Sequence, residues 1–298
     1  MTDGKACLSS QMARYPSYQF NFGSIEDPSE PEAIILPIPY SYTASYGPSV
    51  REGPERIISV SKNLEVYDEE LLTPLEDLKI RTLPFLEPSA VGPLDMIKRI
   101  EGAVAEIYNG ERLLVPLGGE HTITIGVVKA LKKRYDDLSI LILDAHDDLR
   151  QDYESSPYSH ACVSRRLAEI CPVLIIGVRS ISTLPDDRPE NLQVVIGSEF
   201  KGGKDWRKLV EGLKGPLYIS CDFDVFDPSV MASVGSPEPD GLYWSDVTAI
   251  IRYAIKTRDV ICTDFVELAP IPGMIAPDFT AAKLIMRTIG YWCCRSRL

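Results

Sequence analysis

The sequence predicts a single-domain α/β fold with three αβα layers, in which helices cover both faces of a mainly parallel central sheet. One observation is that short apolar segments alternate with longer segments of helical character, as they do in parallel sheets with crossover helices. Another is that 298 residues, 45% of them hydrophobic, can bury one large core. We therefore expect one domain over 1–298, with 1–30 as its N-terminal segment.

Apolar runs rich in branched residues predict the strands. The clearest is SILIL at 139–143, because a continuous apolar run of this length is typical of a strand buried on both faces. The predicted strands are 33–38, 113–117, 139–143, 173–178, 192–196, 217–221 and 259–266.

Helical segments separate these strands. The two glycines of Gly118-Gly119 allow a tight turn into a helix that begins near Thr122, and Ser159 can cap the start of the next helix. The last helix is apolar and would pack either on the core or on a neighbouring subunit. The predicted helices are 53–64, 93–109, 121–135, 159–170, 204–213, 245–257 and 278–292.

Composition excludes several classes of protein. The net charge of −12 disfavours binding to nucleic acid or to anionic membrane, and would mildly concentrate cationic substrates. No apolar stretch approaches the roughly 20 residues that cross a bilayer, and the first residues lack a continuous signal core. Seven cysteines, an odd number without a C-x-x-C pair, are typical of reduced thiols. We expect a cytoplasmic protein.

All three histidines lie in short acidic or glycine-rich segments. One of these segments, Asp144-Ala145-His146-Asp147-Asp148, follows the strand at 139–143 directly. If its backbone stays extended, period-two alternation places Asp144, His146 and Asp148 on one face and turns Ala145 and Asp147 away. The sequence therefore predicts three converging ligand groups at the carboxyl end of this strand.

A second strand repeats the pattern. The apolar run ending at Cys221 leads into Asp222-Phe223-Asp224, and extended backbone would place Asp222 and Asp224 on one face. His121 comes from a third place, the turn that follows the strand at 113–117. Ligands of an open parallel sheet bind outside the carboxyl ends of its strands, where all these residues are predicted to lie.

These side chains predict a site for two metal ions. Four aspartates on adjacent strand ends would repel one another unless a cation were present. Six ligands exceed the needs of one four-coordinate zinc but suit two metals about 3.5–4 Å apart, and an oxygen-rich set with two imidazoles favours manganese over zinc. The predicted metal ligands are His121, Asp144, His146, Asp148, Asp222 and Asp224.

Five motifs in this order resemble those of the ureohydrolase family of arginases and agmatinases. The resemblance begins near Ile35 and extends to the last predicted helix, and none of its departures removes a candidate ligand. The matching segments are GGEH at 118–121, DAHDD at 144–148, SHA at 159–161, SCDFDVFDP at 220–228 and DFVELAP at 264–270, with an upstream PYSYTASYGP at 39–48.

The resemblance implies a mechanism and a role for each residue. His121 and Asp148 would hold one manganese, His146 and Asp224 the other, and Asp144 and Asp222 would bridge the two. A metal-bridging hydroxide would attack the guanidinium carbon of the substrate and release urea and an amine. The catalytic residues would be His160, Glu267 and Asp148, and the family also implies trimers or hexamers.

Two of these roles also make chemical sense by themselves. The carboxylate of Glu267 offers bidentate recognition of a guanidinium, and the imidazole of His160 suits proton transfer near physiological pH. The alternatives are a surface or capping carboxylate at Glu267 and an ordinary polar residue at a helix start for His160. The apolar strand that precedes Glu267 favours its functional role.

The loop at 150–158 is predicted to select the substrate. Asp152, Tyr153 and Glu154 would bind a cationic amine tail, as in agmatine, and the products would then be urea and putrescine. The alternatives are an arginase, a guanidinobutyrase, or a loop that is only a solvated turn. Glu120 stands where the family more often has aspartate, and Asp147 where it often has threonine, so these departures bear on the substrate pocket.

Three other functions fit the sequence less well. A metal-dependent deacetylase would use one zinc and a pair of adjacent histidines, and the chain has no such pair. A two-metal phosphoesterase would bring more histidines and basic groups for phosphate. The third is a non-catalytic oligomer of ureohydrolase shape. Metal content would distinguish it from an enzyme, because such a protein need not hold two metals per subunit.

Overall fold

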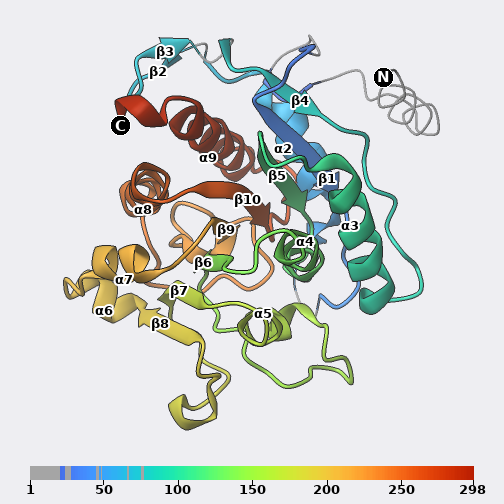
Figure 1. Ribbon diagram of the computed structural model, residues 1–298, viewed down its shortest axis with the longest axis vertical. Coiled ribbons are helices and arrows are strands. Elements are labelled where there is room, and N and C mark those ends of the chain that lie inside the picture. The colour runs from blue at the N-terminus through green and yellow to red at the C-terminus, as the bar shows by residue number, and fades with distance from the viewer. Residues whose placement is uncertain (1–20, 24–27, 45–46, 48, 66, 75–76) are drawn as a thin grey trace.

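The computed structural model describes residues 21–23, 28–44, 47, 49–65, 67–74 and 77–298 (Figure 1). Most of the predicted N-terminal segment 1–30 and part of the motif at 39–48 lie outside the described residues. The extent of the domain over 1–298 stays a prediction for this reason. The six described cysteines are free thiols, as expected, and no described helix is long and apolar enough to cross a membrane.

An eight-stranded sheet forms the centre of the molecule, and every strand pair in it is parallel. All seven predicted strands are present within a residue or so of their predicted bounds. The order across the sheet is β4 (Ile80–Thr82), β1 (Ala33–Ile38), β5 (Leu113–Gly118), β10 (Val260–Val266), β9 (Leu217–Asp222), β6 (Ser139–Leu143), β7 (Val173–Val178) and β8 (Leu192–Ile196).

Helices cover both faces of this sheet, so the three-layer prediction is confirmed (Figure 1). One face packs against α2 (Gly53–Ser61), α7 (Trp206–Gly212), α8 (Trp244–Thr257) and α9 (Ala276–Cys293). The other face packs against α3 (Pro93–Ile107), α4 (Ile123–Lys132) and α5 (Val163–Ala168).

Strand alternation separates the core into two layers. In β1, the side chain of Ile35 enters one apolar cluster, whereas Ile34 and Leu36 enter the other. Successive side chains of a strand point to opposite faces, and a strand that is covered on both sides must be apolar throughout. The continuous apolar runs in the sequence are therefore the direct consequence of a two-sided core.

The sequence did not predict the shortest elements. The edge strand β4 and the hairpin of β2 (Tyr67–Asp68) with β3 (Thr73–Pro74) contain only two or three residues each, too few for a periodic signal. The short helix α6 (Gly197–Lys201) was also absent from the predictions. The predicted helix 159–170 is shorter than expected, because it starts with a 3₁₀ turn at His160–Cys162 before α5.

The sequence left open whether the last helix packs on the core or on a neighbouring subunit. Helix α9 packs on the core of its own chain. Leu284 and Ile289 are buried against α2 and α8. The indole N–H of Trp292 donates to the carbonyl oxygen of Val260 at 2.8 Å and so connects the end of the helix to β10.

A buried ion-pair network holds the β2–β3 hairpin on α9. The guanidinium of Arg287 donates to the carboxylate of Asp68 through Nε at 2.8 Å and also binds Glu69. Both Arg287 and Asp68 are almost completely buried. Lys283 lies 3.1 Å from Glu69, and the hydroxyl of Tyr291 donates to Glu70 at 2.6 Å.

We expect Arg287→Met to lower the free energy of unfolding by about 3–5 kcal/mol, because it removes the hydrogen-bonded counter-charge of the buried Asp68 carboxylate and leaves only Lys283, 3.6 Å away. Denaturant unfolding measures this change. Arg252→Met is the matched control, since the Arg252 side chain is 45% exposed and pairs with Glu70 at 3.3 Å. The control should change the stability by less than about 1 kcal/mol. Equal losses in both variants would contradict the proposed role of the buried network.

Candidate metal centre

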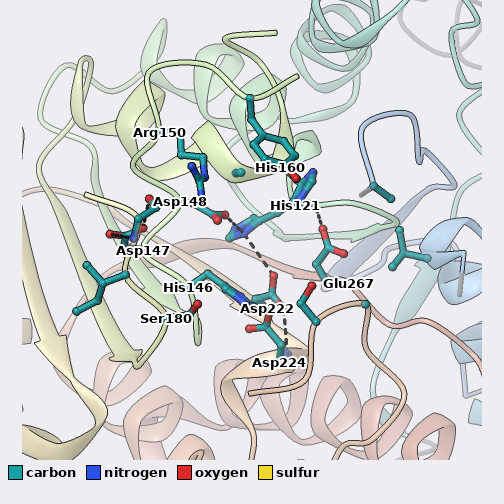
Figure 2. Close-up of a pocket in the computed structure, with 18 residues that line it drawn as sticks. His121, His146, Asp147, Asp148, Arg150, His160, Ser180, Asp222, Asp224 and Glu267 are labelled. Carbon is teal, nitrogen blue, oxygen red and sulfur yellow. Dashed lines mark hydrogen bonds and ion pairs between the residues drawn. The ribbon is translucent and has the colours of Figure 1, made fainter. Parts of the chain in front are cut away.

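The predicted ligands gather at the carboxyl edge of the sheet, where β5, β10, β9 and β6 are neighbours. They arise from different strand ends, yet Figure 2 shows the five that line the cavity pointing toward one another: His121, His146, Asp148, Asp222 and Asp224. This cavity has a volume of about 200 Å³. Its lining includes His121, His146, Asp148, His160, Asp222, Asp224 and Glu267.

The first ligand group centres on His121. Its Nδ1 lies 3.2 Å from Asp144 Oδ2, 3.3 Å from Asp148 Oδ2 and 3.4 Å from Asp222 Oδ2. The imidazole is 1% exposed, and its three neighbours are buried or nearly so. One nitrogen surrounded by three carboxylate oxygens from two other strand ends is an arrangement that suits a shared cation.

The second ligand group centres on His146. Its Nδ1 lies 2.8 Å from Asp224 Oδ2 and 3.8 Å from Asp144 Oδ1. Asp144 therefore faces both groups, one with each carboxylate oxygen, as expected for a bridging ligand. The ligand atoms of His121, Asp144 and Asp148 lie close enough together to hold one ion, and so do those of Asp144, His146 and Asp224. Asp222 joins the first group through its contact with His121. The six predicted ligands thus lie in two adjoining groups that share Asp144.

The backbone that brings these ligands together differs from the extended form that the sequence predicted. Asp148 has a φ of 47°, in the left-handed region, and Phe223–Val225 forms a 3₁₀ turn. The prediction of a common face by strand alternation was wrong at these positions. Asp222 Oδ1 accepts the backbone N–H of Asp224 at 2.9 Å and so caps the turn, which directs Asp224 toward His146.

Segment 144–147 stays paired with β7 and with the segment after it, which explains why the turn comes at Asp148. The backbone N–H of Asp144 donates to Ile176, and that of Asp147 donates to Ser180 at 3.1 Å. Beyond this pairing the chain leaves the sheet, and its left-handed residue turns the Asp148 carboxylate back toward His121. Non-glycine residues in this region are strained and cluster at functional sites.

Two buried atoms of the cluster have no hydrogen-bond partner within the described part of the chain: His121 Nδ1 and Asp144 Oδ2. The other imidazole nitrogen, Nε2, lies 3.0 Å from Ser220 Oγ, and Ser220 in turn donates to Asp264 at 2.6 Å. Since Ser220 gives its hydrogen to Asp264, His121 Nε2 must donate, and Nδ1 is left to bind a proton or a cation. Histidines that bind a metal usually donate the N–H of their other ring nitrogen to a neighbouring polar group, as His121 does here, so these residues fit a metal.

Asp144 and His146 hold their protons more tightly than usual when no metal is present. Burial, followed by the charges of Asp224 and Asp148, raises the pKa of Asp144 to about 8. Burial by itself would lower the pKa of His146, but the Asp224 carboxylate outweighs it and raises that pKa to about 10. The same ion pair overcomes burial and lowers the pKa of Asp224 to about 2.

Protons and metal should therefore compete for the site. We expect the apparent metal affinity to fall as the pH falls, because Asp144 and His146 must lose their protons to bind a cation. Each displaced proton weakens binding about tenfold per pH unit below its pKa. Calorimetric titration of metal between about pH 6 and pH 9, in buffers of different ionisation enthalpy, counts the released protons. An affinity that does not depend on pH would contradict the role of these two ligands.

Glu267 presents a carboxylate to the same cavity from the residue that follows β10. Its φ of 68° lies in the left-handed region, and its backbone N–H donates to the carbonyl of Gly119 at 2.8 Å. The carboxylate accepts the backbone N–H of His121 at 2.6 Å. Burial raises the pKa of Glu267 to about 8, so a bound cation would favour its charged form.

His160 lies at the cavity with its ring between two neighbours. Thr43 Oγ1 is 3.1 Å from its Nδ1, and the ring of Tyr153 meets it edge-on with 5.8 Å between centroids. His160 does stand at a helix start, as one alternative held, but it also lines the cavity. The two interpretations are compatible.

The loop at 150–158 contributes unequally to the cavity. Tyr153 lines it, whereas Asp152 and Glu154 are exposed and lie outside the lining. The cation-binding roles of these two carboxylates stay predictions. Arg150, which was not predicted to take part, also lines the cavity, and its guanidinium lies 5.3 Å from the centre of the Tyr153 ring.

Two charged residues that the sequence interpretation missed hold the loops of the site. The guanidinium of Arg179 donates to the carbonyl oxygens of Asp224 at 2.7 Å and Phe226 at 3.1 Å, and so fixes the turn at 223–225. Asp147 accepts the hydroxyl of Ser182 at 2.6 Å and holds the loop at 180–183. Arg179 and Asp147 both lie just after the carboxyl end of a strand. This position in the sequence could have indicated that they belong to the site.

The sequence profile of the arginase family matches residues 31–290. The chain belongs to the arginase family. It is 36% identical over 270 residues to an N(1)-aminopropylagmatine ureohydrolase of Synechocystis sp., a match that covers 87% of this chain and 88% of the relative. An agmatinase of Pyrococcus horikoshii is 32% identical over 289 residues, covering 93% and 97% of the two chains.

The fold leads to the same family. The crystal structure of an agmatine ureohydrolase of Thermoplasma volcanium superposes with a TM-score of 0.85 at 28% identity, covering 97% of this chain and 99% of that one. The resemblance inferred from the five motifs is confirmed, and so is the arginase-like fold. The chain is an enzyme, an arginase-family ureohydrolase similar to agmatinases, and this excludes the deacetylase, phosphoesterase and non-catalytic alternatives.

Proposed function

We propose that the chain hydrolyses a guanidino amine, agmatine in the simplest case, to urea and putrescine. One observation supports this most: two ligand groups that share Asp144 adjoin a partly buried carboxylate, Glu267, that has a raised pKa and faces the same cavity. This cavity therefore offers a place for metal next to a place for a planar cation. The trimer or hexamer implied by the resemblance stays a prediction.

Two manganese ions would occupy the centre. His121 and Asp148 would hold one and His146 and Asp224 the other, with Asp144 between the two groups and Asp222 beside His121. When bound, such a pair lowers the pKa of a coordinated water and so supplies a nucleophile near neutral pH. The oxygen-rich donor set supports manganese rather than zinc.

The protein's own residues would bind and orient the guanidinium. Glu267, held by the backbone N–H of His121, would accept two parallel hydrogen bonds from the substrate and keep its planar carbon facing the ligand groups. A guanidinium is resonance-stabilised, so fixing its orientation matters for reaction. His160, on the side of the cavity marked by Tyr153, would hand a proton to the departing amine.

N(1)-aminopropylagmatine is a second candidate substrate. Relatives of that name from Synechocystis sp., Thermus thermophilus and Thermococcus kodakarensis are 33–36% identical to this chain. The longer molecule carries a further ammonium group. The exposed carboxylates of Asp152 and Glu154, just outside the lining, would suit such a group.

Urea release by the manganese-loaded protein tests the proposal, with agmatine, N(1)-aminopropylagmatine, arginine and guanidinobutyrate as substrates. We expect kcat/KM to be at least about 100-fold higher for one of the two amines than for the carboxylate-bearing compounds. Asp152→Asn with Glu154→Gln should lower kcat/KM for the longer amine more than for agmatine. Preference for a carboxylate-bearing guanidine would overturn the substrate class, and no urea from any compound with two metals bound would overturn the reaction.

A further inference from the structure

Thr43 connects a buried carboxylate to the imidazole of His160. The carboxylate belongs to Glu120, which is fully buried. Its Oε2 accepts the backbone N–H groups of Tyr42 and Thr43 at 2.7 and 2.8 Å, and its Oε1 lies 3.1 Å from the hydroxyl of Thr43. The same hydroxyl oxygen lies 3.1 Å from His160 Nδ1 and accepts the backbone N–H of His160 at 3.0 Å.

The hydrogen count in this chain of contacts is fixed. A threonine hydroxyl has one hydrogen, and the Thr43 hydroxyl is placed to donate it to Oε1 of Glu120. Thr43 therefore gives its hydrogen to Glu120, and its oxygen can only accept from His160. Because Nδ1 lies at hydrogen-bond distance from that oxygen, Nδ1 must carry the hydrogen of the neutral imidazole.

We propose that Glu120 and Thr43 are positioning residues that set the tautomer of His160, with hydrogen on Nδ1 and the lone pair on Nε2. This inference rests on the proposed function, in which His160 transfers a proton. In this tautomer Nε2 takes up a proton and later donates it, while Nδ1 keeps the ring in place. Among the described residues no hydrogen-bond partner occupies Nε2, so it is available to a substrate in the cavity.

Ser159 is the competing partner. Its Oγ lies 3.3 Å from His160 Nδ1, and a hydrogen donated by Ser159 would force the imidazole hydrogen onto Nε2. That arrangement would place the lone pairs of Nδ1 and Thr43 Oγ1 against each other at 3.1 Å. The shorter contact to Thr43 and this repulsion favour hydrogen on Nδ1.

Neutral His160 in the full-length protein can be observed directly by ¹⁵N nuclear magnetic resonance of the histidine side chains. The chain has only three histidines, and His160→Asn identifies the signal of this one. Magnesium replaces manganese in these samples, because the unpaired electrons of manganese broaden the signals. We expect hydrogen on Nδ1 in the unchanged protein and in the Thr43→Ser variant, which keeps the hydroxyl.

Two further variants separate Thr43 from Ser159. Thr43→Val has nearly the same shape but no hydroxyl, so among the described residues Ser159 is the side-chain partner that remains at Nδ1, and the hydrogen should move toward Nε2. Ser159→Ala should leave the hydrogen on Nδ1. Hydrogen on Nε2 in the unchanged protein, or an unchanged tautomer in Thr43→Val, would overturn the inference.

Turnover gives a second measurement. Thr43→Val should lower kcat by about 10–100-fold, because a well-positioned acid–base group contributes about 100-fold or more to the rate. KM and metal content should stay nearly unchanged. Thr43→Ser should restore most of kcat. A loss of metal or of folding stability together with kcat would instead indicate a merely structural role. If no substrate releases urea, the proposed function is wrong. The tautomer of His160, measured by nuclear magnetic resonance, still tests the roles of Thr43 and Glu120 in that case.

Discussion

Asp222→Asn should lower metal content and hydrolysis together while the fold survives. Asp222 Oδ2 faces His121 in the first ligand group, and Asp222 Oδ1 caps the turn at 223–225. Asparagine keeps a capping oxygen but removes the negative charge that a divalent cation requires. We expect metal content to fall from about two ions to about one or fewer per chain, and turnover by about 10³-fold or more.

The metal-free variant should be at least as stable as the metal-free parent. Burial and the nearby charges of Asp224 and Asp144 raise the pKa of Asp222 well above its usual range, so its negative charge is unfavourable there. Thermal unfolding without metal, and elemental analysis of the loaded protein, measure the two effects separately.

Asp227→Asn is the matched control, because it makes the same change in the same motif. The carboxylate of Asp227 accepts hydrogen bonds from Ser229 and Gly241 and lies outside the cavity lining. It should keep both metals and most of the turnover. Full activity in Asp222→Asn, or loss of metal in Asp227→Asn, would refute the assignment of the ligands.

Glu267→Gln should abolish recognition of the guanidinium without loss of metal. The neutral amide cannot accept two charge-assisted hydrogen bonds, and such a buried pair is worth about 2–5 kcal/mol. We therefore expect kcat/KM to fall by about 30-fold to several thousandfold. Steady-state kinetics with the preferred substrate measures the effect.

The same substitution should raise the stability of the substrate-free protein. Burial raises the pKa of Glu267 to about 8, so the folded state holds this proton more tightly than the unfolded chain does. When the pKa of a carboxyl is higher in the folded state than in the unfolded chain, the free energy of unfolding decreases as the pH rises from the unfolded pKa to the folded pKa. Above the folded pKa the carboxyl is ionised in both states, and the free energy of unfolding stays at this lower value. Glutamine does not ionise, so the variant should unfold at a higher temperature at neutral pH. Opposite changes in activity and stability distinguish lost recognition from misfolding.

Glu238→Gln provides the control for this second prediction. Its carboxylate lies 3.9 Å from His146 Nε2 but outside the cavity lining, and its side chain is 35% exposed. We expect kcat/KM to change by less than about fivefold, because a partly exposed charge contributes little. A loss as large as that of Glu267→Gln would mean that negative charge in general, and not this carboxylate, binds the substrate.

The predictions for Asp222 and Glu267 concern residues that the sequence had already indicated. The parallel sheet explains why the sequence could indicate them. Apolar runs such as 139–143 indicated strands buried on both faces, and the acidic groups stood directly after them. The carboxyl ends of parallel neighbours meet at one edge, so Asp144 and Asp222 had to lie close together once β6 and β9 were paired. Element order and apolar pattern are local properties, and a sequence contains them directly.

Contacts between distant segments required the tertiary structure. Thr43 and His160 are 117 positions apart, and no local pattern in either segment predicts their hydrogen bonds. The turns at Asp148 and at 223–225 broke the expected alternation, because capping and pairing with a neighbouring segment outweighed the tendency to stay extended. The sequence by itself determined the family, the sheet and the set of candidate ligands. Only the tertiary structure decided which atoms face the cavity, because the orientation of a side chain depends on the partners that folding brings beside it.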